Sequence, residues 1–255
     1  MAGKNIVILT GGNFSTAALY NALKQQYNIT VIVENRVNKK QFLQRRIKKL
    51  GYVAVTGQIL FQTLIGKFLA IKSRRRINEI LEQYQLDLTA IPENVIIRVS
   101  SVNDQACIDH LVKINPDVVI VNGTRIIKEK VLNAINVPFI NTHTGITPKY
   151  RGVHGGYWAL VNKDPENCGV TVHLVDKGID TGSVIHQGMI KPQRNDNFST
   201  YTVLQIGVGI RLMVQTISEY FEGRLVTKQV NLESKIWSHP TIWKYIKHRI
   251  LDGVK

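Results

Sequence analysis

The sequence predicts an α/β fold in which a doubly wound, mainly parallel sheet carries a β-hairpin at one edge and a basic helical insertion. Three observations support this. Short apolar runs alternate with helix-length segments, an order typical of parallel sheets. Two strictly alternating segments follow late in the chain, as an antiparallel hairpin requires. The segment 36–76 holds twelve Lys or Arg and no acidic residue.

The composition is that of a globular protein. The chain has 255 residues, 44% hydrophobic and 20% charged, enough for one large domain with appendages. Two cysteines cannot form a disulfide framework, and no Cys/His cluster has zinc-like spacing. We therefore expect a cytoplasmic protein without a metal. Its domain should cover 1–225, with an insertion over about 36–84, and a C-terminal extension should cover 226–255.

A first βαβ unit is expected at the start of the chain. NIVILT (5–10) is typical of a buried strand rather than a secretory signal, a helix should run from about Ser15 to Gln26, and ITVIV (29–33) should be the second strand. The turn GGNFST between them offers backbone N–H groups at a helix N-terminus, where anions are favoured. A complete G-x-G-x-x-G pattern is missing, so this turn alone indicates nucleotide binding weakly.

Residues 38–84 are expected to be helical. In QILFQTLIGKFLA the apolar residues recur in pairs every four positions, which predicts one helix face. These residues are Leu60, Phe61, Leu64, Ile65, Phe68 and Leu69. The stretch 52–71 approaches the length of a membrane span, but Gln58, Gln62 and Lys67 interrupt it. We expect it to pack on the domain or on a second subunit in a homodimer, with contact to a membrane surface as the minor alternative.

The net charge of +15 is concentrated in two places. The segment 36–76 carries twelve positive charges, and 235–255 has five Lys or Arg against Asp252. Such patches are compatible with a solvated helix face, a phosphorylated substrate, anionic lipid or nucleic acid. Nucleic acid is not the expected partner. Nucleic-acid binding would predict salt-dependent retention on a polyanion with no preference for a small ligand.

After the insertion the alternation of strands and helices resumes. Strands are expected at 94–99, 117–123 and 137–143, with helices at 103–113 and 128–135 between them.

A hairpin and a long helix should complete the domain. CGVTVHLVD (168–176) and SVIHQGMI (183–190) alternate strictly between apolar and polar residues. A long amphipathic helix should follow at 199–222, and the tail from about Leu225 is expected to add a strand and a short helix.

The stretch INTHTGITPKYRG (140–152) is the strongest candidate site. Asn141 and His143 are two residues apart at the end of an apolar strand, so their side chains point to the same side. In open α/β sheets, ligands bind at the carboxyl ends of the strands.

INTHTGITPKYRG, followed by Asp180 in VDKGIDTGSVI, resembles the N10-formyltetrahydrofolate-dependent formyltransferase superfamily. Members have a Rossmann-like fold and formylate phosphoribosylglycinamide, methionyl-tRNA or nucleotide-linked amino sugars. The resemblance implies that Asn141, His143 and Asp180 are catalytic and that N10-formyltetrahydrofolate is the co-substrate. For folate binding it implies Gly123, Thr124, Arg125, Ile126, Ile127, Val175, Asp176 and Gly178. For acceptor binding we expect Gly11, Gly12, Asn13, Ser15, Lys149 and Arg151.

The chemistry of formyl transfer explains these residue types. Attack of an amine on the formyl carbon gives a negative oxygen, to which Asn141 and His143 can donate. The carboxylate of Asp180 favours a charged imidazole and can hold a water that relays the proton. His173, a lone histidine on a strand, is expected to be structural.

The expected acceptor of the formyl group is inferred from the length of the chain and from two of its segments. A methionyl-tRNA enzyme is expected to carry a further C-terminal barrel, whereas a short tail follows the last long helix here. RGVHGGYWALVNKD and GVTVHLVDKGIDTGSVIHQ resemble the amino-sugar enzymes, so a nucleotide-linked amino sugar is the expected acceptor. Glycinamide ribonucleotide or another small amine, hydrolysis of the formyl-folate, and a non-catalytic folate- or nucleotide-binding relative are the alternatives.

Overall fold

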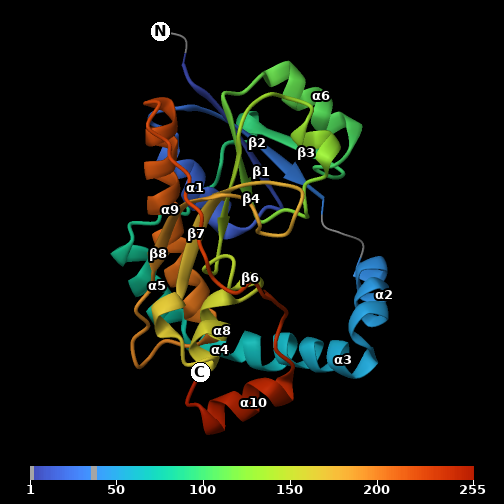
Figure 1. The fold of residues 1–255 in the computed structure, drawn as a ribbon, viewed down its shortest axis with the longest axis vertical. Helices are drawn as coiled ribbons and strands as arrows, with labels where there is room; N and C mark the ends of the chain where they lie inside the picture. The colour runs from blue at the N-terminus through green and yellow to red at the C-terminus, as the bar shows by residue number, and fades with distance from the viewer. Residues whose placement is uncertain (1–2, 36–38) are drawn as a thin grey trace.

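The computed structural model describes residues 3–35 and 39–255. Seven strands form one sheet in the order β3-β2-β1-β4-β5-β7-β8 (Figure 1). They are β1 (Asn5–Thr10), β2 (Asn28–Glu34), β3 (Ile96–Val99), β4 (Val118–Asn122), β5 (Phe139–His143), β7 (Gly169–Leu174) and β8 (Val184–Met189). The first five pair in parallel, and β7 and β8 add an antiparallel edge. The predicted fold class is confirmed.

The central strands are buried on both faces, which explains their unbroken apolar runs. In β1, Ile6 is 1% exposed and Val7, Ile8 and Leu9 are fully buried. This strand lies between β2 and β4, in register with both. Its carboxyl end therefore opens onto the same edge as those of its neighbours.

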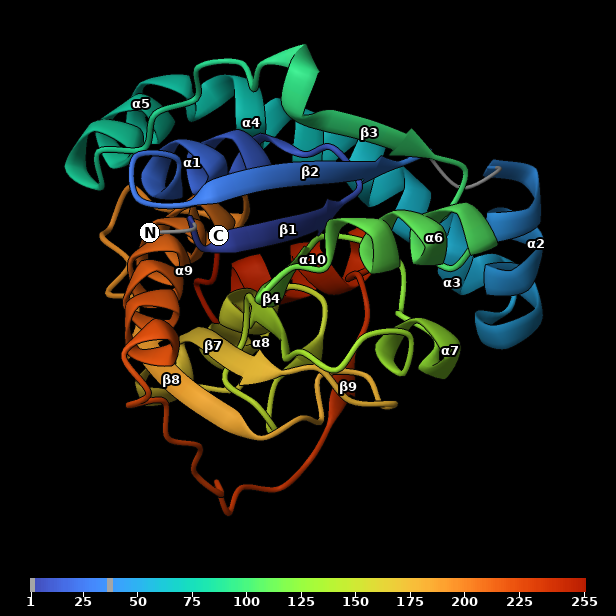
Figure 2. The ribbon, with the colours of Figure 1, turned by 90° about the horizontal axis from the view of Figure 1, so that it is seen from above.

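Helices cover both faces of the sheet (Figure 2). They are α1 (Phe14–Leu23), α2 (Lys39–Leu50), α3 (Tyr52–Leu60), α4 (Lys67–Lys72), α5 (Arg74–Gln83), α6 (Gln105–Ile114), α7 (Glu129–Leu132), α8 (Gly155–Val161), α9 (Phe198–Phe221) and α10 (Ile242–Leu251). Leu23 of α1 and Met213 of α9 belong to the core on one face, and Leu111 of α6 and Val131 of α7 to the core on the other.

The helical insertion is not uniform. After Gly51, with φ of +80°, one continuous helix runs through α3, a π-helical stretch (Phe61–Gly66) and α4. The expected packing on the domain holds for one side of this helix. Phe61 and Leu69 are buried, but their preceding neighbours point about 100° away around the helix. The exposed members are Leu60, Leu64 and Phe68.

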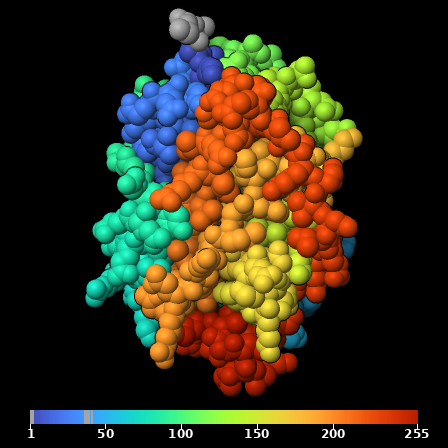
Figure 3. All heavy atoms as spheres, turned by 60° about the vertical axis from the view of Figure 1, so that its left-hand side comes forward, coloured from blue at the N-terminus to red at the C-terminus, as the bar shows by residue number. Residues whose placement is uncertain are grey.

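The C-terminal tail forms a strand and a helix, as expected. Strand β9 (Ile236–Trp237) pairs in parallel with β6 (Arg151–Gly152), which lies in the loop after β5. Helix α10 lies at one end of the molecule (Figure 3), and its Tyr245 ring packs 5.0 Å from that of Phe61. The tail therefore joins the loop after β5 to the insertion. The division of the chain at residue 225 stays a prediction.

Candidate active site

Two predicted catalytic residues lie at the carboxyl end of β5. Asn141 and His143 stand opposite His173 and Thr171 of β7. The His143 side chain is 5% exposed, so its ring is enclosed by protein. Because residues two apart share one face of a strand, both side chains point the same way.

Asp180 approaches the His143 ring from the turn between β7 and β8. Its Oδ2 atom lies 3.3 Å from Nδ1 of His143 and accepts a hydrogen bond from the Gly152 backbone N–H at 3.0 Å. The other ring nitrogen, Nε2, lies 2.7 Å from the carbonyl oxygen of Tyr150. Both neighbours are acceptors, so an imidazolium with a hydrogen on each nitrogen satisfies both. The structure thus brings His143 and Asp180 together.

Asn141 joins this pair through His173. Nδ1 of His173 lies 2.7 Å from the Leu174 carbonyl oxygen and donates to it, which leaves Nε2 to accept from Nδ2 of Asn141 at 3.1 Å. The same Nε2 lies 3.8 Å from Oδ1 of Asp180. Burial lowers the pKa of His173, which favours the neutral ring that this arrangement needs. His173 uses one of the two amide hydrogens of Asn141, so the second is the one suited to a ligand.

Gly145 shapes the turn that follows β5. Its N–H donates to the His143 carbonyl at 2.9 Å. A Cβ at this position would lie 2.7 Å from Nε2 of His143 and would overlap the Tyr150 carbonyl oxygen. The hydroxyl of Thr171 donates to the Gly145 carbonyl at 2.8 Å, which ties the turn to β7. Only glycine permits the contact between the ring and the carbonyl.

The two segments predicted to bind folate follow strands that run in opposite directions, because β4 is parallel and β7 antiparallel to β5. Residues 123–127 follow β4, and residues 175–178 follow β7. Lys177 and Glu129 form an ion pair at 2.5 Å that joins the two regions. In the first of these segments Ile126 is 58% exposed, so an apolar side chain is accessible there.

The predicted residue Asp176 is engaged within its own turn. Its Oδ1 accepts from the backbone N–H of Gly178 at 2.9 Å and from the Thr181 hydroxyl at 2.6 Å. The N–H of Val175 donates to the Phe139 carbonyl at 2.8 Å, next to the end of β7. The Asp176 carboxylate therefore fixes the turn that carries Asp180.

Sequence reasoning missed Glu34, a 6% exposed residue at the end of β2. Its carboxylate accepts from the backbone N–H groups of Arg125 at 2.9 Å and of Val102 at 3.1 Å. It also pairs with the Arg125 guanidinium at 2.5 Å. Arg125 therefore anchors the 123–127 segment. The signal available in the sequence was a single acidic residue ending the apolar run NITVIVE.

The glycine turn after β1 lies against the turn after β4. A Cβ on Gly11 would lie 2.8 Å from the Gly123 carbonyl oxygen, and Gly12 has a φ of +75°. The Ser15 hydroxyl donates to Oδ1 of Asn13 at 2.7 Å. The Gly12 N–H donates to the Thr10 hydroxyl at 3.0 Å, so the backbone amides of Gly11 and Asn13 are what this turn offers to an anion.

The two basic residues predicted to bind the acceptor are placed differently. Lys149 forms an ion pair with Asp164 at 2.6 Å. Arg151 lies in β6, and its Nε atom is buried with no hydrogen-bond partner in the described part of the chain. Arg151 is the better candidate for an anionic ligand.

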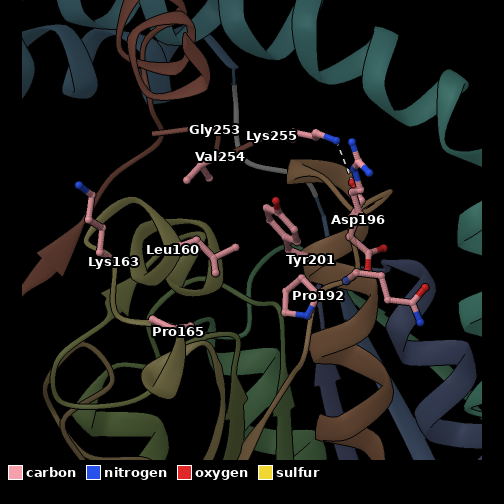
Figure 4. A pocket seen from close by; sticks show the side chains of 11 residues that line it. Leu160, Lys163, Pro165, Pro192, Asp196, Tyr201, Gly253, Val254 and Lys255 are labelled. Atoms are coloured by element: carbon pink, nitrogen blue, oxygen red, sulfur yellow. Dashed lines mark hydrogen bonds between the residues drawn. The ribbon is translucent and has the colours of Figure 1, made fainter. Parts of the chain in front are cut away.

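A cavity of about 190 Å³ adjoins Asp180. Its lining comprises Thr147, Pro148, Asp180, Thr181, Gly182, Ser183, Val184, Lys228, Gln229 and Val230. Among the residues that the structure describes, the buried Thr147 hydroxyl has no partner. A larger pocket of about 760 Å³ lies elsewhere, where Tyr201 faces the end of the chain (Figure 4). None of the predicted catalytic residues lines it.

The fold and the site define a class: an α/β protein with an amide, an imidazole and a carboxylate gathered at the end of a central strand. Residues 4–216 match the family model described as formyl transferase. This match covers most of the chain, and the chain belongs to the formyl transferase family.

Curated relatives match in part. A methionyl-tRNA formyltransferase of Caldanaerobacter subterraneus subsp. tengcongensis is 29% identical over 147 residues, which are 57% of this chain and 47% of the relative. That of Finegoldia magna is 38% identical over 97 residues, 38% of this chain and 31% of the relative. The chain spans about half the length of these relatives or less.

Solved structures share the fold. A sugar N-formyltransferase from Shewanella sp FDAARGOS_354 aligns with a TM-score of 0.59 at 15% identity, over 92% of this chain and 76% of that one. Phosphoribosylglycinamide formyltransferase from Anaplasma phagocytophilum aligns with a TM-score of 0.59 at 15% identity, over 92% and 98%. At such identities the similarity establishes the fold alone.

Proposed function

We propose that this protein transfers a formyl group from N10-formyltetrahydrofolate to a primary amine. One observation carries the proposal, namely the cluster at the end of β5. His143 lies between Asp180 and the Tyr150 carbonyl, and Asn141 is oriented by His173. An amide donor, an imidazole and a carboxylate gathered at one strand end are the groups that acyl transfer to an amine requires.

In the proposed reaction the amine nitrogen attacks the formyl carbon, and the bond from that carbon to N10 then breaks. The second amide hydrogen of Asn141 donates to the developing oxyanion, and the positive ring of His143 stabilises it. Asp180 holds a water that takes the proton from the amine and delivers it to N10 of the leaving tetrahydrofolate. No step in this scheme uses a metal.

The folate is proposed to bind to the segments 123–127 and 175–178. Exposed Ile126 supplies an apolar surface for the pterin ring, and the backbone groups around it supply hydrogen bonds. Glu34 holds the first segment in place through its bonds to Arg125.

The proposed acceptor is an amino sugar. Thr147, Thr181, Ser183 and Lys228 line the cavity beside Asp180, and the Thr147 hydroxyl lacks a partner among the described residues. Such a lining suits the hydroxyl groups of a sugar better than an apolar side chain.

The sugar is proposed to be linked to a nucleotide diphosphate. Two groups suit an anionic phosphate: the backbone amides of Gly11 and Asn13 at the start of α1, and the Nε of Arg151, which has no partner among the described residues. Glycinamide ribonucleotide, which also carries a phosphate, is the second candidate acceptor.

A panel of amines tests the function. The purified protein is incubated with N10-formyltetrahydrofolate and nucleotide-linked 3-amino or 4-amino sugars, glycinamide ribonucleotide or methionyl-tRNA, and the tetrahydrofolate and formylated amine are quantified. We expect turnover with an amino sugar. Turnover with glycinamide ribonucleotide alone would reassign the acceptor, and formate release without an amine would indicate hydrolysis. Folate binding without any turnover would identify a non-catalytic relative.

A further inference from the structure

Helices α2, α3, α4 and α10 expose large apolar side chains. We call this surface the insertion face. Its exposed apolar members are Phe42, Leu43, Leu50, Tyr52, Val53, Ile59, Leu60, Leu64, Phe68, Ile71, Trp243, Ile246, Ile250 and Leu251. These helices lie at one end of the molecule (Figure 1), and α3 contacts both α2 and α10. Soluble monomers rarely gather so much exposed apolar surface, so the face indicates a binding surface.

The helix over Tyr52–Lys72 is apolar on both sides. Phe61 and Leu69 on the inner side are buried in the core, whereas Leu64 and Phe68 on the outer side are 56% and 60% exposed. By length and composition this 21-residue helix could cross a membrane. Only 28% of its most apolar 18-residue stretch is buried in the protein. Packing on the domain therefore accounts for one side of the helix and leaves the other unexplained.

Helix α10 extends the face next to α3. The Trp243 ring occupies the space where a Cβ on Gly57 would lie, and Tyr245 packs against Phe61. With Tyr245 turned inward, Ile250 on the outer side is 74% exposed. A tryptophan at the rim of an exposed apolar surface is typical of proteins that bind at a membrane interface.

The insertion face is also basic. Helices α2 and α4 have no acidic residue and carry eight of the twelve Lys or Arg of segment 36–76, and α10 carries Lys244, Lys247 and Arg249. In α2 the side chains of Lys48 and Lys49 are exposed. Positive charge around apolar side chains complements a surface that is negative outside and apolar beneath.

We propose that the insertion face docks onto the surface of an anionic lipid bilayer. The outer apolar side chains enter the boundary between head groups and acyl chains, and the Lys and Arg side chains meet lipid phosphates. A second copy of the chain fits less well, because it would bring two segments of the same charge together. A nucleic acid would meet the charges but leave the apolar side chains without a partner.

The helix over Tyr52–Lys72 lies on the bilayer and does not span it. Nε2 of Gln58 donates to the His239 carbonyl oxygen at 2.8 Å, and Nδ2 of Asn197 donates to the hydroxyl of Ser73 at 2.7 Å. A spanning helix would have to break these bonds to the rest of the chain and carry Gln58 into hydrocarbon without a partner.

Sedimentation with vesicles tests the proposal without using catalysis, so it stands apart from the proposed function. The purified protein is mixed with vesicles of phosphatidylcholine alone or with about a quarter phosphatidylglycerol. We expect binding to the anionic vesicles and at least tenfold weaker binding to the neutral ones. High salt should release part of the protein, since exposed charges are screened.

Paired variants locate the contact. Leu64→Ser with Phe68→Ser should weaken binding by about tenfold or more, whereas Val112→Ser, an exposed apolar residue on α6, should not. Lys48→Glu with Lys49→Glu should weaken binding to anionic vesicles by about tenfold or more. Lys113→Glu with Lys191→Glu makes the same change in net charge elsewhere and should leave binding within about twofold. All four sets replace exposed residues, and an unchanged Tm confirms folding.

Four results would overturn the proposal. One is no binding to anionic vesicles by a folded monomer. Another is a dimer, detected by light scattering, that is lost in the Leu64→Ser, Phe68→Ser variant while vesicles are not bound. A third is retention on duplex DNA without vesicle binding. The fourth is equal loss of vesicle binding in the two charge-reversal variants, which would show an effect of net charge only.

Discussion

At the scale of single residues, the first prediction concerns His143 and the hydrogen-bond acceptor Asp180 beside its ring. His143→Asn removes the imidazole of the proposed mechanism, and Asp180→Asn removes the carboxylate that lies 3.3 Å from the ring and accepts from Gly152. We expect each variant to lower kcat by about 100-fold or more, because charged groups at a developing oxyanion and proton relay contribute on that scale. Formyl-folate turnover with the best amine measures it.

Asp109→Asn, on the exposed face of α6, is the matched control for the loss of one carboxylate and should keep wild-type kcat. Each active-site variant must keep its Tm within a few degrees for the comparison to count. A rate above about a tenth of wild type in either one would remove that residue from the proposed mechanism.

Sequence reasoning identified residues that lie in motifs of characteristic spacing, and it missed the residues that orient their side chains. Asn141, His143 and Asp180 lie in ordered motifs, so they could be named before their geometry was known. His173 and Glu34 act through partners far along the chain, at Asn141 and at Arg125. Such partnerships are created by strand pairing and loop packing, which no local pattern encodes.

At the scale of an element, the turn after β5 depends on Gly145. Because a Cβ there would overlap the Tyr150 carbonyl and press on Nε2 of His143, Gly145→Ala should shift both groups. We expect a loss of about 1–3 kcal/mol in the free energy of unfolding and a fall in kcat. Gly66→Ala in the continuous helix is the control, since its Cβ would meet only ordinary contacts and alanine favours a helix. Urea unfolding and turnover are measured on both variants, and equal losses in the two would contradict the role given to Gly145.

The contact between the loop after β6 and the tail predicts a dependence of stability on pH. Nε2 of His154 lies 2.8 Å from Nδ1 of His239, and burial lowers the pKa of His154 to about 3 and of His239 to about 4. In the unfolded chain both titrate near 6.5, so below that pH the unfolded state binds more protons and stability falls. Between pH 7 and 5 we expect each histidine to cost about 2 kcal/mol.

Urea unfolding at pH 7 and pH 5 measures this slope. His239→Gln keeps a polar side chain at the contact but removes one titrating group. About half of the stability lost between pH 7 and pH 5 through the two histidines should therefore be retained. An unchanged slope in this variant would show that His239 binds its proton in the folded protein.

Among the elements, prediction succeeded where the pattern and the environment agreed. The fully apolar runs of β1 and β4 are buried on both faces, and the alternating runs of β7 and β8 form the antiparallel edge. The helix over Tyr52–Lys72 packs on the domain with one side, as expected, while the apolar residues of its other side are exposed in the described chain. Periodicity identifies which residues share a face and does not say what covers that face.

At the scale of the whole molecule, the insertion is part of the core rather than an appendage. Phe61, Leu69 and Ile80 belong to the same buried cluster as Tyr157 of α8 and Tyr245 of α10. Deletion of 36–76 would open this cluster, so point variants are needed to study the insertion. The homodimer and the cytoplasmic location stay predictions.

A buried ion pair fastens the insertion to the segment before α9. The Arg76 guanidinium binds the Asp196 carboxylate with two hydrogen bonds, at 2.9 and 3.2 Å, and the Asp196 side chain is fully buried. This carboxylate raises the pKa of Arg76, so the guanidinium stays charged. Arg76→Met would leave the buried carboxylate without its cation, and we expect a loss of about 3 kcal/mol in the free energy of unfolding.

Two further variants isolate the effect of that pair. Arg75→Met, on the same helix, removes a 95% exposed partner of Glu79 and should cost less than about 0.5 kcal/mol. Arg76→Met combined with Asp196→Asn should recover part of the loss, because the amide is neutral and its oxygen still accepts from the Gln193 N–H. Equal costs for the Arg76 and Arg75 variants in urea unfolding would show that Asp196 finds water or another cation. The insertion would then be held by its apolar contacts and by hydrogen bonds such as those of Gln58 and Ser73.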